Sequence, residues 1–292
     1  MAVIQWFPGH MAKAKREISE KIKLIDLVIE LKDARIPYSS TNPMIDEIVG
    51  NKPRLILLCK SSIADPAITK EWIEYYRKNN IIALDIDSIT NYHIKDVVKY
   101  ANLALKETFE NRRKKGILSK QIKAIILGIP NVGKSTLINS LAKRKATNVG
   151  DRPGVTKNQT WIKISDELFI MDTPGILWPK FEDQIVGLKL AMCGSIKDEI
   201  LDLENIVLES IDYLAKNYPD MLIKRYGITI TEPEDMLDQI GRKRGFLLKG
   251  GIVDTERVHK MFLIELRGMK IGAMSYERPS TWFIWIWRKI IW

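Results

Sequence analysis

Cysteine is almost absent from this chain of 292 residues, which contains only Cys59 and Cys193. Two thiols cannot build the disulfide framework of a small secreted protein. The sequence also lacks an uninterrupted apolar run of about 20 residues, the length that a membrane-spanning helix requires. Its first residues show no apolar segment of the kind found in signal peptides. We therefore expect a cytoplasmic protein that does not associate with a membrane.

Acidic residues are too few to balance the basic ones, and the formal net charge at pH 7 is +10. The surplus lies in residues 1–175, with 29 Lys and Arg against 19 Asp and Glu, whereas residues 176–292 carry 17 of each kind. A basic balance suggests a polyanionic partner. The hydrophobic content of 46% is that of a globular protein, and the length suffices for about two domains.

The most informative stretch runs from Gly128 to Ser135 and reads GIPNVGKS. It follows an apolar run over 124–127 and precedes a helical pattern over 136–141, so it joins a predicted strand to a predicted helix. In a GxxxxGK[ST] loop the glycines let backbone N–H groups surround phosphate oxygens, the lysine reaches the terminal phosphates and the hydroxyl binds Mg²⁺. The helix N-terminus adds a favourable dipole. Lys134 and Ser135 are therefore predicted to bind a nucleotide's phosphates and its metal ion.

Strands and helices alternate through the first 178 residues. Apolar runs bounded by turn residues predict the strands, and segments with helical spacing separate them. This alternation predicts an α/β fold with a doubly wound, mostly parallel sheet, whose ligands bind at the carboxyl ends of the strands. We expect strands at 27–31, 55–58, 81–86, 124–127, 160–164 and 168–171, and helices at 12–24, 66–78, 93–111 and 136–141, with a short helix after residue 43.

The pattern becomes helical beyond Trp178-Pro179. Helical segments at 182–193, 198–217, 234–244 and 254–269 predict a smaller all-α domain over residues 179–278, after a first domain at 1–178. Residues 279–292 form a separate tail that holds four of the eight tryptophans. A terminal strand, an interfacial anchor and a non-native extension all fit this tail, and the last fits best because such a run favours aggregation.

Two further segments complete the predicted phosphate site. Asp172 follows a predicted strand and begins Asp-Thr-Pro-Gly, where its carboxylate can hold Mg²⁺ through water and the Gly175 N–H can meet the γ-phosphate. Thr156 lies in the polar stretch 144–157, a connection whose length indicates a functional loop. We expect Thr156 to close over the metal ion as an order-to-disorder switch.

The motifs GIPNVGKS, PGVT (153–156) and DTPG (172–175) together resemble those of translation-factor-class GTPases. In such GTPases a base-selecting segment, Asn-Lys-x-Asp, follows these motifs, but its counterpart here, residues 59–62, precedes them. This order resembles the circularly permuted GTPases. Three more motifs make the sequence most similar, to about residue 278, to the RbgA (YlqF) family of ribosome-assembly GTPases: WFPGHMAKA at 6–14, DARIP at 33–37 and TPGILWPKFED at 173–183.

The resemblance implies a GTP-hydrolysing switch that uses GTP and GDP, Mg²⁺ and potassium, and that promotes late assembly of the large ribosomal subunit. Many small GTPases position water with a glutamine where this chain has Ile176. The resemblance offers His10 instead, although a capping or core histidine is the alternative. It implies catalytic roles for His10, Lys134, Thr156 and Gly175, metal contacts at Asn131, Ser135, Thr156 and Asp172, and nucleotide contacts at Cys59, Lys60, Ser62, Ser88, Asn131, Val132, Gly133, Lys134, Ser135, Thr136 and Gly175.

The base-selecting segment departs from the family pattern at both ends. Cys59 and Ser62 stand where an asparagine and an aspartate hold the guanine in that pattern. A serine offers no charged bidentate acceptor, a loss of about 1.5–3 kcal/mol. Asp65 could replace the carboxylate only in a rearranged loop, and the retained Lys60 could pack over the phosphate loop. The sequence therefore leaves a second function open, a non-catalytic or relaxed-specificity nucleotide-binding assembly module.

Clusters of basic residues indicate where RNA could bind, since grouped Lys and Arg make phosphate contacts. A solvated helix end is the alternative for each cluster. The expected partners are ribosomal RNA and a precursor of the large ribosomal subunit, and we expect a monomer. The clusters are Lys13, Lys15 and Arg16, then residues 112–115, then Arg242, Lys243 and Arg244.

Overall fold

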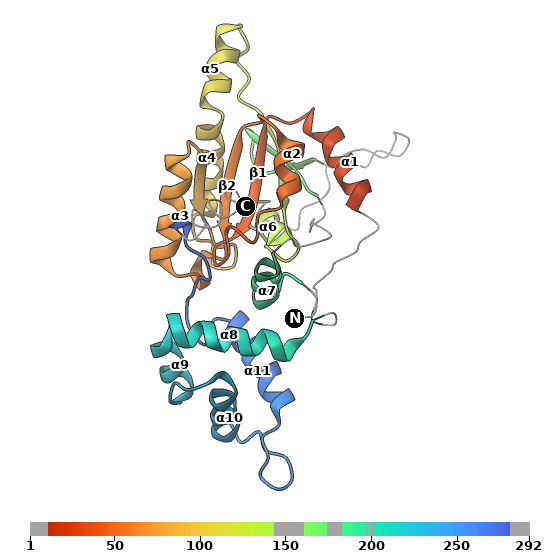
Figure 1. The fold of residues 1–292 in the computed structure, drawn as a ribbon. Helices are drawn as coiled ribbons and strands as arrows, with labels where there is room; N and C mark the ends of the chain where they lie inside the picture. Colours follow the sequence, from red (N-terminus) through yellow and green to blue (C-terminus); the bar gives the residue numbers. More distant parts are fainter. Residues whose placement is uncertain (1–10, 143–160, 174–182, 197, 199–200, 281–292) are drawn as a thin grey trace, which may run out of the picture. The chain divides into compact units, whose positions relative to one another are not determined.

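The computed structural model describes residues 11–142, 161–173, 183–196, 198 and 201–280. These residues form two compact units. The sheet unit contains the described residues up to 173 together with residues 275–280, and the helical unit contains those from 183 to 274. Figure 1 shows the helices and strands of both units.

A six-stranded sheet is the framework of the sheet unit. Its strands lie in the order β3-β2-β1-β4-β6-β5, and all neighbours are parallel except β5, which runs antiparallel to β6. Every residue of β1 is buried, as expected of a parallel strand covered on both faces. The predicted α/β fold with a mostly parallel sheet is confirmed. The strands are β1 (Leu27–Asp33), β2 (Arg54–Cys59), β3 (Ile82–Asp85), β4 (Ile122–Gly128), β5 (Trp161–Lys163) and β6 (Leu168–Met171).

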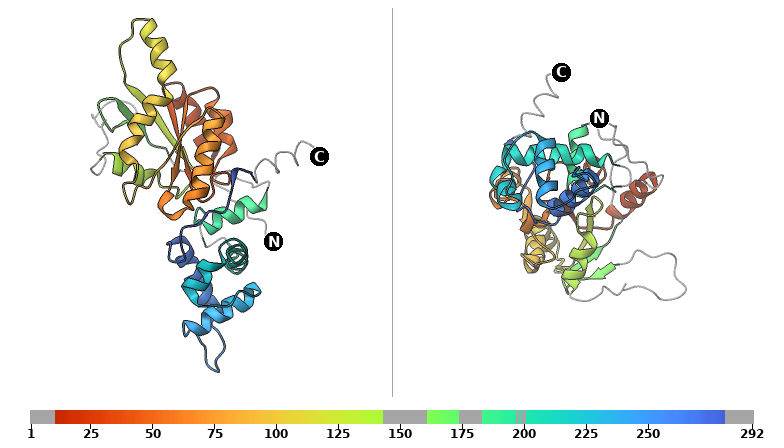
Figure 2. Two further views of the ribbon diagram at one scale, coloured as in Figure 1. Left: turned by 90° about the vertical axis from the view of Figure 1, so that its left-hand side faces the viewer. Right: turned by 90° about the horizontal axis from the view of Figure 1, so that it is seen from below.

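Helices cover both faces of this sheet (Figure 2). On one face, Ile18 of α1 and Ile45 of α2 pack in one core cluster with Val28 of β1, and Trp72 of α3 packs with Ile56 of β2. Helices α4 and α6 lie on the opposite face. The helices of the unit are α1 (Met11–Ile22), α2 (Pro43–Val49), α3 (Pro66–Lys78), α4 (Val97–Ala104), α5 (Lys106–Lys114) and α6 (Lys134–Ala142), with 3₁₀ turns η1 (Ser61–Ile63) and η2 (Ile94–Asp96).

Residues 93–111, predicted as helical, are helical for most of their length, but they are divided into η2, α4 and α5. The break lies at Leu105, whose side chain is buried and whose φ of −104° ends α4. The charged α5 then has no buried residue and extends beyond the sheet (Figure 1). A continuous helical pattern does not indicate this break.

The helical unit is built around α8 (Leu203–Asn217), which contacts the other four helices described in the unit. Val207, Ile211 and Leu214 of α8 are fully buried in its core. Sequence analysis began α8 five residues too early and missed α9, which is too short for a periodic pattern. The remaining helices are α7 (Gln184–Met192), α9 (Pro219–Tyr226), α10 (Pro233–Lys243) and α11 (Thr255–Arg267). Across the described residues of both units, no helix has the length and apolar character needed to cross a membrane.

Residues 275–280 pack on the sheet unit, so the predicted boundary at residue 278 falls inside this segment. The Glu277 carboxylate accepts hydrogen bonds from the backbone N–H groups of Tyr38 (2.8 Å) and Ser39 (3.1 Å). The indole N–H of Trp72 donates to the Glu277 carbonyl at 3.0 Å. The segment is therefore anchored to the loop that follows β1.

Candidate nucleotide-binding site

The phosphate loop, residues 128–135, joins β4 to α6. Asn131 and Gly133 adopt left-handed backbone conformations, with φ of 58° and 110°. Backbone turns of this kind direct successive N–H groups into a concave anion site. Gly128 lies so close to β1 that an added Cβ would be 2.9 Å from the Leu31 carbonyl oxygen. A glycine is therefore required where the loop leaves the sheet.

Lys134 begins α6, and its side chain folds back over the phosphate loop. Its Nζ donates to the carbonyl oxygens of Gly128 (3.0 Å) and Ile129 (2.9 Å), and the residue is 8% exposed. Burial lowers the pKa of Lys134 to about 8, although the negative charge of Asp172 opposes this change. Carbonyl oxygens solvate the ammonium group without neutralising it. The loop therefore fits an anion such as a nucleotide's phosphates, which would stabilise the buried charge.

Asp172 lies at the same edge of the sheet as the phosphate loop. It directly follows β6, whose Met171 pairs with Ile125 of β4, and it is exposed. The next residue, Thr173, is buried and donates from Oγ1 to the Ile126 carbonyl at 2.6 Å. Within the described ranges, no three His, Cys, Asp or Glu side chains could hold a metal ion by themselves. A Mg²⁺ ion at this edge would need hydroxyl, water and phosphate oxygens besides Asp172.

The base-selecting segment, residues 59–62, also lies at this edge. It follows β2, and only β1 separates β2 from β4 in the sheet. Cys59 is buried, with its thiol directed at the Leu57 carbonyl oxygen 3.7 Å away, and burial raises the pKa of this thiol. The positive charge of Lys134 opposes this rise in the pKa of the Cys59 thiol. The fold therefore brings the segment and the phosphate loop together, with a neutral thiol at the first position.

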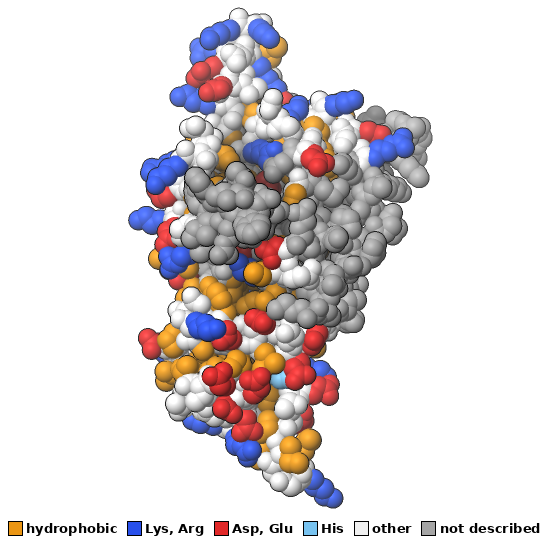
Figure 3. Space-filling view, viewed as in Figure 1, with side chains coloured by type: hydrophobic (Ala, Val, Ile, Leu, Met, Phe, Trp, Pro, Cys, Tyr) orange, Lys and Arg blue, Asp and Glu red, His pale blue; other side chains and the backbone are white. Residues whose placement is uncertain are grey.

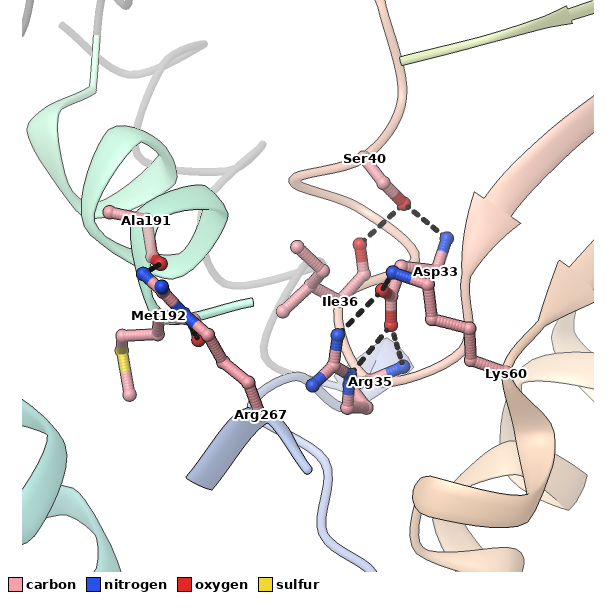
Figure 4. A network of polar contacts seen from close by, with 8 residues as sticks. All are labelled: Asp33, Arg35, Ile36, Ser40, Lys60, Ala191, Met192 and Arg267. Atoms are coloured by element: carbon pink, nitrogen blue, oxygen red, sulfur yellow. Dashed lines mark hydrogen bonds and ion pairs between the residues drawn. The ribbon is translucent and has the colours of Figure 1, made fainter. Parts of the chain in front are cut away.

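An ion-pair network joins the base-selecting segment to β1 (Figure 4). Lys60 has a left-handed φ of 59°, and its Nζ lies 3.0 Å from Oδ2 of Asp33. Arg35 donates to both oxygens of the same carboxylate, from Nε at 3.0 Å and from Nη2 at 2.8 Å. Burial alone would raise the pKa of Asp33, but the two cations lower it well below its usual value. Lys60 is thus paired with Asp33, and its packing over the phosphate loop stays a prediction.

The sequence contains a signal for this network that was not recognised. Asp33 ends a strand of buried residues and Arg35 follows it, at a place where a charged side chain needs a partner. Both are almost fully buried, at 0% and 2% exposure. The network therefore stabilises the turn at Lys60, because separating its buried charges would cost free energy.

Ser62 lies in η1 and is exposed, and its hydroxyl donates a hydrogen bond to Oδ2 of Asp87. Asp87 follows β3, the neighbour of β2. The other oxygen of Asp87 accepts hydrogen bonds from the backbone N–H groups of Ile89 (2.8 Å) and Thr90 (3.0 Å). A carboxylate thus lies beside the position where the family pattern has one, but it comes from another loop. Sequence analysis did not identify Asp87.

Two neighbouring residues have structural contacts of their own. The carbonyl of Ser88 accepts a hydrogen bond from Oγ of Ser140 in α6 at 3.0 Å, so the loop after β3 is tied to the helix of the phosphate loop. Asp65 caps α3, where its Oδ1 accepts from the N–H groups of Ala67 (2.9 Å) and Ile68 (3.3 Å). The observed loop therefore uses Asp65 as a helix cap and not as a base-facing carboxylate.

The described part of the phosphate loop contains the remaining predicted contacts. Val132 is buried, whereas Asn131, Ser135 and Thr136 are exposed. The other predicted residues, His10, Thr156 and Gly175, lie outside the described residues, as does the tail from 281 to 292. Their roles stay predictions.

The strand order and the positions of these loops define the class of protein. The phosphate loop after β4, Asp172 after β6, the base-selecting segment after β2 and Asp87 after β3 share one edge of one sheet. Ligands of doubly wound folds bind at this edge. The strands that carry the base-selecting loops precede the strand of the phosphate loop in sequence. The sheet unit is therefore a circularly permuted P-loop nucleotide-binding domain.

Comparisons with known proteins agree with this class. A family described as "50S ribosome-binding GTPase" matches residues 123–231, a range that begins at the strand of the phosphate loop. Ribosome biogenesis GTPase A from Bacillus cereus is 50% identical over 281 residues, 95% of each chain. The protein of the same name from Priestia megaterium is 51% identical over 95% of this chain and 97% of its own. This chain belongs to the ribosome biogenesis GTPase A family.

Solved structures are also similar to the chain. The GDP-bound structure of TM YlqF has a TM-score of 0.66 and 28% identity, covering 91% of this chain and 100% of that one. GNP-bound YlqF from T. maritima has a TM-score of 0.62 and 29% identity, covering 91% and 98%. The chain is a GTP-hydrolysing enzyme of this family, and the non-catalytic alternative is not favoured.

Proposed function

We propose that this GTPase is a nucleotide-dependent switch that binds precursors of the large ribosomal subunit and promotes their late assembly. The observation that carries the proposal is the convergence of the phosphate loop and the base-selecting segment at one edge of the sheet. Relatives that share half of its residues over 95% of the chain are named for ribosome biogenesis. Rearrangement of such a site on hydrolysis can change the affinity for a large partner.

In this proposal the phosphate loop holds the nucleotide through its backbone and Lys134. The N–H groups of residues 131–133 and of Thr136 surround the phosphate oxygens, and the ammonium group of Lys134 binds the terminal phosphates. The Ser135 hydroxyl and the Asp172 carboxylate, with Thr156, hold the Mg²⁺ ion. Mg²⁺, when bound, neutralises negative charge on the terminal phosphates. Asn131 would also contact a potassium ion.

Hydrolysis requires an oriented water molecule, and we propose that His10 orients it. The aliphatic Ile176 has no group that can bind water, whereas an imidazole can accept a proton near neutral pH. The N–H of Gly175 would bind the γ-phosphate, and Lys134 would stabilise the charge that develops on it. Cys59, Lys60, Ser62 and Ser88 would surround the base.

The end of α5 is the basic cluster best suited to RNA. Arg113, Lys114 and Lys115 are exposed there, and Figure 3 shows basic side chains gathered along this helix. In the helical unit, by contrast, Arg242 pairs with Asp238 and Arg244 pairs with Glu265. Exposed cations can bind RNA phosphates without first breaking an ion pair. We therefore place the main phosphate contacts at 113–115.

The remaining parts of the proposal concern the whole chain. We propose that the protein acts as a monomer in the cytoplasm, and the two buried, free cysteines fit a reducing compartment. Residues 1–178 would form the GTPase domain with its N-terminal arm, and residues 179–278 a helical domain that binds RNA and the ribosome. The tail at 279–292 has no role in this proposal.

Co-sedimentation with purified large-subunit precursors tests the proposed function. The full chain is mixed with the precursors in the presence of a non-hydrolysable GTP analogue, GDP or no nucleotide. We expect the most association with the analogue, and less for a variant in which Arg113, Lys114 and Lys115 are replaced by glutamate. Glutamate at the exposed Lys70, Lys78 and Lys95 of the sheet unit provides a control with the same charge change. Equal association in all nucleotide states, or none, would contradict the proposal.

A further inference from the structure

Hydrogen bonds join the loops that follow β2 and β3. The backbone N–H of Ser61 donates to the Ile86 carbonyl at 3.1 Å, and the hydroxyl of Ser62 donates to Oδ2 of Asp87. The backbone bond fixes the separation of the loops, so the hydroxyl and the carboxylate face each other. Ser62 is exposed whereas Asp87 is 4% exposed, so of the two side chains the serine is the more accessible to a ligand.

The direction of the hydrogen bond between the two side chains follows from their chemistry. Burial alone would raise the pKa of Asp87, but hydrogen bonds from the hydroxyl of Ser62 and from the backbone N–H groups of Thr90, Ile89 and Ser62 lower it. Asp87 is therefore ionised at neutral pH and can only accept hydrogen bonds. The single hydrogen of the Ser62 hydroxyl must point to Asp87. Both lone pairs of the serine oxygen then remain for another partner.

A serine whose hydrogen is held in this way is an obligate acceptor. An unconstrained hydroxyl rotates, and it can donate to one ligand and accept from another. The Watson–Crick edge of guanine presents two neighbouring donors, the N1–H and the 2-amino group, whereas adenine presents an acceptor at N1. An obligate acceptor therefore pairs with guanine and leaves adenine N1 without a donor.

We propose that Ser62 selects guanine in this chain by accepting from the N1–H and the 2-amino group, and that Asp87 is the positioning residue that makes Ser62 an acceptor. The pair thus replaces the aspartate of the family pattern with a hydroxyl and a carboxylate from two loops. This inference rests on the proposed nucleotide site, and it goes beyond that site in naming the atoms that distinguish guanine from adenine. It also gives the chain a means of selecting guanine although its base-selecting segment begins with a neutral thiol.

Calorimetric titration of the full chain with Mg²⁺-GDP and Mg²⁺-ADP tests the proposal. In Ser62→Ala we expect the GDP affinity to fall about tenfold, the effect of losing about 1.4 kcal/mol, while the ADP affinity changes less than about threefold. In Asp87→Asn the amide can still accept from the N–H groups of Ile89 and Thr90, which preserves the loop. Its NH₂ group can also donate to Ser62, so the hydroxyl turns outward. We then expect the ratio of GDP to ADP affinity to fall at least about tenfold.

Asp85→Asn is the matched control, because it removes a carboxylate at the end of β3, two residues before Asp87, but not the partner of Ser62. Asp85 contacts His93, and we expect an unchanged affinity ratio. A double variant adds a rescue. Ser62→Asp alone would place two carboxylates side by side and weaken GDP binding, whereas Ser62→Asp with Asp87→Asn would restore it to the wild-type level or above.

The possible outcomes separate this proposal from the proposed function. Wild-type chain that binds neither nucleotide would overturn both. Tight GDP binding with an unchanged affinity ratio in Asp87→Asn would overturn only the role of the pair. The same holds if Ser62→Asp alone binds GDP as well as the double variant, since the carboxylates would then not be neighbours in the nucleotide site.

Discussion

Replacing Arg35 with methionine would test the network beneath the base-selecting segment. Methionine retains much of the apolar length of the side chain but removes the guanidinium group that donates two hydrogen bonds to Asp33. Asp33 is fully buried, and its carboxylate would keep only one of its two cationic partners. Lys60 would stay as a cation 3.0 Å away.

The expected loss of stability of the sheet unit can be worked out from these contacts. Removing one partner of a buried ion pair costs about 3–5 kcal/mol. The Lys60 side chain is 27% exposed and still balances Asp33, and the backbone N–H of Arg35 still donates to Oδ1 at 3.1 Å. We therefore expect a loss of stability at the lower end of this range, about 3 kcal/mol. This loss would shift the opening equilibrium of the sheet unit about a hundredfold.

Amide hydrogen exchange of β1 and β2 measures this loss in the sheet unit itself, which matters because a chain with two units need not unfold in one step. The control is Arg35→Met with Asp33→Asn, which also removes the buried carboxylate and leaves only the partly exposed Lys60 without its partner. We expect the double variant to regain more than about half of the lost free energy. A single variant that exchanges like wild type would refute the buried network.

The same network predicts a dependence on pH with a defined sign. The pKa of Asp33 is lower in the folded chain than its unfolded value of about 3.9, so its contribution is complete above that pH and is lost as the pH falls through the folded pKa. Without Arg35 one of the two cations that lower this pKa is lost, so the pKa lies closer to its unfolded value. The free-energy difference between wild type and Arg35→Met, measured by the same hydrogen exchange, should therefore narrow as the pH falls from about 5 to about 2. A difference that widens would contradict the assigned charges.

Three further predictions concern other parts of the sheet unit. Lys134→Met should lower GDP affinity at least about a hundredfold in calorimetry, because the buried ammonium group is the cation of the phosphate loop; unchanged affinity would exclude it from the site. Gly128→Ala should lower both stability and GDP affinity, since the new Cβ would be 2.9 Å from a backbone carbonyl of β1 that cannot give way; a fully stable variant that binds GDP would contradict the close approach. Glu277→Ala should remove the acceptor of the N–H groups of Tyr38 and Ser39, and hydrogen exchange should show a loss of stability of about 2–3 kcal/mol. Arg278→Ala, which breaks an exposed ion pair, should lower the stability by less than about 1 kcal/mol.

The sequence predicted most of the sheet unit because its signals are local. The apolar run 55–58 lies within β2, and the phosphate loop joins a strand to a helix as its spacing requires. Each of these patterns depends on residues within about ten positions, which is the range over which periodicity is informative. Helix α9 was missed because its eight residues give too few turns for such a pattern.

Contacts between loops could not be predicted in the same way. Ser62 and Asp87 are 25 positions apart, and Lys60 and Asp33 are 27 apart. Only the order of the strands brings each pair together, and no periodicity encodes that order. Leu105, at which α4 ends, is fully buried, and its burial is likewise a property of the packed core.

Hydrogen exchange of the full chain with and without Mg²⁺-GDP tests the central claim most directly. The account predicts that GDP protects both the phosphate loop, 128–136, and the earlier loops at 59–63 and 87–90, and that ADP at the same concentration protects the earlier loops far less. Protection confined to residues 128–136, with no change in the loops after β2 and β3, would contradict a nucleotide site assembled from the two parts of the permuted chain.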